Sequence, residues 1–144
     1  MISERLFDTD WWYWLTITLL LATGLLHWAP ALALGHLVCA ARSVQLAIVA
    51  RSLNAFAVQV NVVFLALVVT TNLFAPQALF ATALVLAGAR VATGYCAIAR
   101  LLALLPINRQ APLTWAVVKC TLFAKPIPGS VLQQAMNPGD MARA

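Results

Sequence analysis

Residues 31–50 read ALALGHLVCAARSVQLAIVA, a run of twenty residues in which Arg42 is the single charged side chain. One helical crossing of a bilayer needs about 20 mainly apolar residues. Similar apolar runs occupy residues 11–28, 55–74 and 78–99, and short turns separate them. The sequence therefore predicts an all-α fold, an integral membrane four-helix bundle built from two helical hairpins.

The overall composition favours the same environment. Of the 144 residues, 63% are hydrophobic and 9% are charged, whereas soluble domains average about 25% charged residues. The formal charge of +5 does not indicate nucleic acid, because the cations are spread along the chain without a basic run. The expected partners are membrane lipids, together with other membrane-protein subunits or further copies of this chain.

The positions of the cations predict how the bundle sits in the membrane. The turns at 28–31 and 74–77 contain no Lys or Arg, whereas the N-terminus, the turn at 51–54 and the region after Arg100 contain the cations that flank the apolar runs. Because cytoplasmic loops carry an excess of Lys and Arg, both termini are expected in the cytoplasm. Trp11, Trp12, Tyr13 and Trp14 form an aromatic anchor at one interface.

The chain divides into a four-helix membrane domain, residues 1–105, and a cytoplasmic region, residues 106–144. Within the second part, residues 113–124 predict a short interfacial helix that lies on the membrane surface. Its Trp115, Val118 and Leu122 share one face, and Lys119 lies elsewhere. The following tail contains several Pro and Gly residues, which disfavour another ordered helix.

Polar side chains inside the predicted crossings indicate where a function could reside. Arg42 and Arg90 lie at similar depth in the cytoplasmic half, and Asn61 and Gln45 fall close to them. We expect Arg42, Gln45, Asn61 and Arg90 to form one buried polar cluster, because intramembrane charges are costly and usually face the bundle interior.

No carboxylate within the predicted crossings is available to neutralise this cluster. The chain contains four acids, which are Glu4, Asp8, Asp10 and Asp140. The favoured interpretation is that both guanidinium groups extend along their own helices to the cytoplasmic interface and make structural hydrogen bonds there. The alternatives are that the cluster contacts an acid of a partner subunit or a bound anion.

Two histidines flank the first predicted outer turn. His27 and His36 would lie near each other in a tight hairpin, and two facing imidazoles are able to ligate a haem, a bacteriochlorophyll or a metal. No C-x-x-C pair, haem-attachment motif or acidic metal partner accompanies them. We therefore expect no cofactor and no metal, with an interfacial hydrogen-bonding role for the histidines and tetrapyrrole binding as a minor alternative.

The fourth run contains a ridge of small residues. Gly88, Ala92 and Cys96 recur every four residues, a spacing that lets another helix approach closely. Motifs for nucleophilic catalysis, such as G-x-S-x-G and H-E-x-x-H, are absent from the sequence. The sequence therefore predicts no catalytic residues and no enzyme.

Three segments carry a resemblance to known proteins. They are the start FDTDWW at 7–12, RSLNAFAVQV at 51–60 and GYCAIARLLALLPINR at 94–109. Together they resemble small multi-pass proteins of the bacterial inner membrane whose function is unassigned. The resemblance implies that location and implies no activity.

Three functions are compatible with these features. The first is an accessory, structural or assembly subunit that packs against a larger membrane complex, respiratory or photosynthetic. The second is a small homo-oligomeric carrier or channel for an anionic solute, lined by polar residues of the third helix. The third is a tetrapyrrole-binding membrane protein that uses the two histidines.

Overall fold

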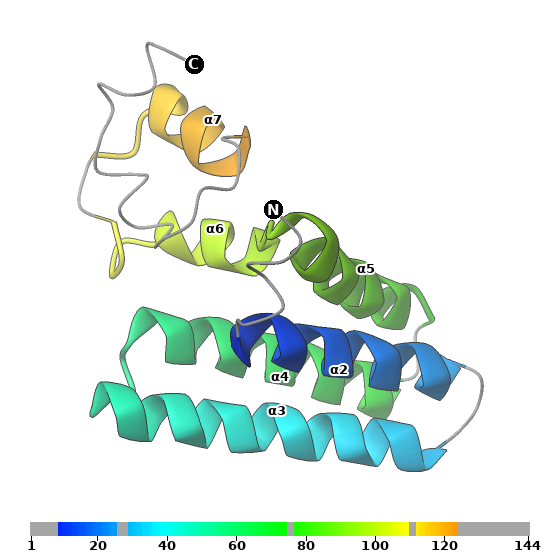
Figure 1. Ribbon diagram of the computed structural model, residues 1–144. Coiled ribbons are helices and arrows are strands. Elements are labelled where there is room, and N and C mark those ends of the chain that lie inside the picture. Colours follow the sequence, from blue (N-terminus) through cyan, green and yellow to red (C-terminus); the bar gives the residue numbers. More distant parts are fainter. Residues whose placement is uncertain (1–8, 26–28, 75–76, 110–111, 124–144) are drawn as a thin grey trace.

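The fold is helical throughout the part of the chain that is described. The computed structural model describes residues 9–25, 29–74, 77–109 and 112–123, and these form six helices without a strand (Figure 1). The all-α prediction is confirmed for these residues. The helices are α2 (Thr9–Leu25), α3 (Ala29–Ala50), α4 (Phe56–Phe74), α5 (Gln77–Thr93), α6 (Ala97–Ala103) and α7 (Trp115–Phe123).

The first four helices pack around one apolar core. α2 lies against α3 and α5, and α4 lies against α3, α5 and α6 (Figure 1). Trp14 of α2 meets Phe64 of α4 edge to face, with ring centroids 5.0 Å apart. Ala83 and Ala87 of α5 are fully buried, so small side chains let this helix approach its neighbours closely.

By length and apolar composition, one helix in the described part of the chain is able to cross a membrane, Pro30–Ala50. A second candidate arises if Ala78–Thr93 and Ala97–Ala103 together form one broken span. Phe56–Thr71 is apolar but shorter. Four packed helices are thus present, and one of them clearly has the length and composition of a membrane span.

The fourth predicted run, 78–99, is not one continuous helix. α5 ends at Thr93, and α6 begins at Ala97 after a bend of 95°. Gly94 has a φ of 75°, a left-handed conformation that ends helices and favours glycine. The backbone N–H of Tyr95 donates to Thr93 Oγ1 at 3.1 Å, which satisfies one donor at the break.

The helix predicted at 113–124 is present as α7, but its faces differ from the prediction. Thr121 is buried against α6, and Val118 and Leu122 are half-buried. Trp115 is 73% exposed and therefore does not share their environment. The structure therefore separates Trp115 from Val118 and Leu122, because α6 covers only one side of α7. The tail after Phe123 lies outside the described residues.

Candidate functional site

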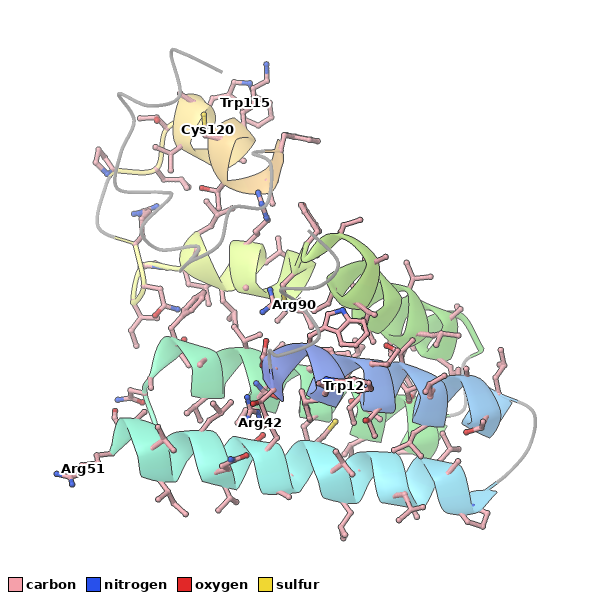
Figure 2. All side chains as sticks on the ribbon, in the orientation of Figure 1. Trp12, Arg42, Arg51, Arg90, Trp115 and Cys120 are labelled. Atoms are coloured by element: carbon pink, nitrogen blue, oxygen red, sulfur yellow. The ribbon has the colours of Figure 1, made fainter. Side chains whose placement is uncertain are left out.

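A cluster of three charged side chains joins three helices near the start of α2. Arg42 Nη2 lies 3.3 Å from Asp10 Oδ1, and Arg90 Nη2 lies 2.9 Å from Asp10 Oδ2. Figure 2 shows the two arginines on opposite sides of the first turn of α2. One carboxylate therefore binds both guanidinium groups, one through each oxygen.

Local sequence places each member of this cluster, which we call the Asp10 cluster (Asp10, Arg42 and Arg90). Asp10 lies in the first turn of α2, where the helix dipole favours a negative charge. Arg90 lies in the last turn of α5, where a cation is favoured. Arg42 comes from the middle of α3. The cluster thus ties together the helices that pack on either side of α2.

The expectation that no acid of this chain neutralises the arginines is wrong. Asp10 was assigned to the segment before the first crossing, but α2 begins at Thr9 and includes it. Its carboxylate consequently reaches the depth of Arg42 and Arg90. Because the pairing is internal, the two arginines do not require an acid from a partner subunit.

The other two predicted members, Gln45 and Asn61, connect to the cluster in different ways. Arg42 Nη1 donates to Gln45 Oε1 at 3.0 Å. Asn61 is buried and accepts a hydrogen bond from the hydroxyl of Tyr13 at 3.0 Å. The Tyr13 ring lies 5.5 Å from the Arg42 guanidinium carbon. Tyr13 therefore links Asn61 to Arg42, a role that the sequence analysis missed.

The cluster is half-shielded and carries excess positive charge. The side chains of Arg42, Arg90 and Asp10 are 16%, 32% and 34% exposed. Two cations and one anion leave a formal charge of +1, and Arg42 Nε is buried without a hydrogen-bond partner among the described residues. Charge-assisted hydrogen bonds of this kind fix geometry strongly, so the arrangement is well suited to holding helices in register.

The structure describes one of the two histidines that were considered as ligands. His27 lies outside the described residues. The ring of His36 is half-buried, and its Nδ1 lies 2.6 Å from the Leu32 carbonyl oxygen. Since a carbonyl only accepts, Nδ1 carries the proton and Nε2 is left as the nitrogen able to ligate. No group of three or more His, Cys, Asp or Glu side chains gathers within the described ranges.

The predicted small-residue ridge is divided between two environments. A Cβ added at Gly88 would meet nothing within 4 Å, and Ala92 is exposed. Cys96, by contrast, is buried in the core beyond the break after α5. The small residues of α5 that pack against other helices are Ala83 and Ala87, so Gly88 and Ala92 face outward.

A second cationic site was not predicted. Arg100 is 2% exposed, and its Nη1 donates to the Thr121 carbonyl oxygen at 2.6 Å. Its guanidinium carbon lies 4.4 Å from the centre of the Tyr95 ring, whose hydroxyl donates to the Leu122 carbonyl at 2.7 Å. The two side chains thus bind carbonyl oxygens at the C-terminal end of α7, where the helix dipole is negative. We call these two residues the α7 clamp.

This second site was not predicted because its residues are far apart in the sequence. Arg100 and Thr121 are 21 residues apart, and they meet because α7 packs against α6. Comparison of the chain with protein-family models, curated proteins and solved structures finds no match.

Proposed function

We propose that the protein is a multi-pass protein of the bacterial inner membrane that acts without catalysis, as an accessory or assembly subunit of a larger membrane complex. Both termini lie in the cytoplasm in this proposal, and α7 lies at the cytoplasmic surface. The observation that carries it is the outer face of α3, whose apolar side chains are exposed in the described part of the chain. Its exposed residues include Leu34, Leu37, Val44, Ile48 and Val49.

An apolar face of this extent is unfavourable in water and is typical of a surface that meets lipid or another protein. Leu37, Ile48 and Val49 are each at least 70% exposed, and they lie on the helix whose length fits a crossing. Lipid chains would cover this face without any polar partner.

The hydroxyl groups support an apolar surrounding. Six threonines on α2, α4 and α5 donate to the carbonyl four residues earlier in their own helix, as does Ser43 on α3. Such bonds satisfy a hydroxyl where water is not available. The threonines are Thr16, Thr18, Thr23, Thr70, Thr82 and Thr93.

The outer face of α5 is the surface through which we propose that a partner helix binds. Val85 is 67% exposed, Ala92 is exposed, and the space beside Gly88 is open. Two small residues four positions apart allow close approach of a second helix, which is a main source of association energy in membranes. The internal pairing of the Asp10 cluster makes close packing, rather than an ion pair, the basis of this interface.

Extraction of the native membrane in mild detergent tests the proposal. The protein should migrate in a large particle that contains other subunits. Gly88→Leu should release it from that particle, because the added side chain fills the space that a partner helix needs. Ala40→Leu is the matched control, since Ala40 is exposed on α3 and the same enlargement there faces away from α5.

Three outcomes would contradict the proposal. A particle that contains this chain alone would exclude an accessory subunit and indicate a homo-oligomer. Release by Gly88→Leu and Ala40→Leu alike would show that the effect is not specific to α5. Extraction of the protein by alkaline carbonate would exclude integral membrane insertion altogether.

A further inference from the structure

The exposed side of α7 combines two aromatic rings with one cation. Trp115 and Phe123 are 73% and 81% exposed, and Lys119 lies exposed between them. These residues are four positions apart, so they share one side of the helix. We call Trp115, Lys119 and Phe123 the α7 face.

The α7 clamp fixes the direction of this face. Arg100 and Tyr95 bind the carbonyl oxygens of Thr121 and Leu122, and the Thr121 side chain is buried. On a helix, Thr121 points roughly opposite to Trp115, Lys119 and Phe123. Figure 2 shows Trp115 on the side of α7 away from α6. The aromatic rings are thus held outward, because turning them inward would break the clamp.

The chemistry of the α7 face matches a lipid surface with negative charge. Trp is enriched at membrane interfaces, Phe inserts among acyl chains, and Lys is attracted to anionic headgroups. Between Asp10 and Asp140 the sequence contains no acid, so no carboxylate in that long segment repels such lipids. An acidic protein would satisfy Lys119 but would leave two exposed aromatic rings to be buried by separate contacts.

We propose that the α7 face is a docking site for anionic phospholipid, with Lys119 at the headgroup phosphates and the rings of Trp115 and Phe123 in the interfacial layer. This inference rests on the proposed function, since it places α7 on the cytoplasmic surface of the membrane that holds the bundle. It adds selectivity for anionic lipid, which the bundle itself does not require.

The test uses the full chain in nanodiscs of phosphatidylcholine, with or without phosphatidylglycerol. A nitroxide is attached at Ala116→Cys, an exposed site beside the α7 face, after the three native cysteines are replaced by alanine. Collision of the nitroxide with oxygen and with a water-soluble nickel chelate reports its immersion. We expect phosphatidylglycerol to shift the ratio of bound to free α7 by about fivefold, the effect of one Lys near an anionic surface.

Variants separate the charge from the apolar contact. Lys119→Gln should abolish the dependence on phosphatidylglycerol, and Lys119→Glu should reverse it. Trp115→Ala with Phe123→Ala should lower immersion in both kinds of disc. Arg109→Gln is the control for a cation outside the α7 face, and a nitroxide at Ser52→Cys, in the turn after α3, reports any general change of the leaflet.

The outcomes distinguish this inference from the proposed function. Protein that enters nanodiscs, with a nitroxide at position 116 that stays in water in both lipids, would overturn the inference and leave the integral protein intact. Equal immersion in nanodiscs with and without phosphatidylglycerol would overturn the anionic selectivity. The same conclusion would follow if Lys119→Glu did not change the immersion. Failure to enter nanodiscs would contradict the proposed function, and flotation of that protein with phosphatidylglycerol vesicles alone would still support the α7 face.

Discussion

Asp10 and Arg90 are 80 residues apart in sequence, and their side chains meet at 2.9 Å. The contact joins α2 to α5, which are the first and the last of the four packed helices in sequence. Trp11 strengthens the same junction, because its indole Nε1 donates to the Val91 carbonyl at 3.1 Å. Two successive residues of α2 thus bind the last turns of α5.

Asp10→Asn should destabilise the bundle. The amide keeps the size of the carboxylate but leaves Arg42 and Arg90 side by side without a neutralising charge. Because the three side chains are partly shielded, we expect a loss of about 1–3 kcal/mol, between exposed and buried pairs. Chemical unfolding of the purified protein in detergent, followed by circular dichroism, measures it. Asp10→Glu preserves the charge and should lose less; equal stability of Asp10→Asn and wild type would refute the role of the cluster.

Loss of either arginine should cost less than loss of Asp10. After Arg42→Gln or Arg90→Gln the carboxylate still binds the other arginine, and the charges of these two side chains balance. Each arginine makes one further hydrogen bond, Arg42 to Gln45 and Arg90 to the Gly94 carbonyl oxygen. Arg42→Gln should be the more damaging of the two, because the Arg42 side chain is less exposed. The same unfolding experiment ranks the three variants. An arginine variant less stable than Asp10→Asn would contradict the view that Asp10 is the centre of the cluster.

Tyr95→Phe should loosen α7 without affecting the bundle. The change removes the hydroxyl that donates to the Leu122 carbonyl and keeps the ring beside Arg100. One such hydrogen bond contributes about 1 kcal/mol. Amide hydrogen exchange should therefore rise about fivefold in residues 115–123, and α2 to α4 should exchange as in wild type. Faster exchange throughout the chain would show instead that α7 and the bundle unfold together.

Hydrophobic periodicity and run length were sufficient to predict the helices α2 to α5, because each is a long apolar segment between turn residues. They were not sufficient to predict the end of α5. Gly94 lies inside the run 78–99 that was predicted as one helix, although the sequence Thr93-Gly94 is a typical helix end. The left-handed glycine, and not the apolar run, determines where the chain bends.

The sequence was sufficient to predict the two cations of the candidate site, Arg42 and Arg90, but not its anion, Asp10. Arg42 and Arg90 stand out because charge within an apolar run is rare. Asp10 lies at the edge of such a run, where a shift of two residues in the helix start decides whether it faces the bundle. Tyr95 and Arg100 were missed because their partners are backbone carbonyls, which leave no trace in sequence.

A matched pair of glycine substitutions tests the packing on either side of the bundle. Gly88 has open space around it, so Gly88→Ala should stabilise the protein by about 0.5–1 kcal/mol through helix propensity alone. A Cβ at Gly24 would fall on the side chain of Leu32, where α2 and α3 cross closely. Gly24→Ala should therefore destabilise, despite the same gain in propensity.

The companion change Leu32→Ala makes this prediction specific. In the Gly24→Ala background it removes the side chain that the new Cβ would strike, so part of the lost stability should return. In the wild-type background the same change removes a half-buried leucine and should destabilise. Opposite signs in the two backgrounds, measured by unfolding in detergent, are the expected result. If Leu32→Ala destabilises both backgrounds equally, then α2 and α3 are not in the close contact that the structure describes.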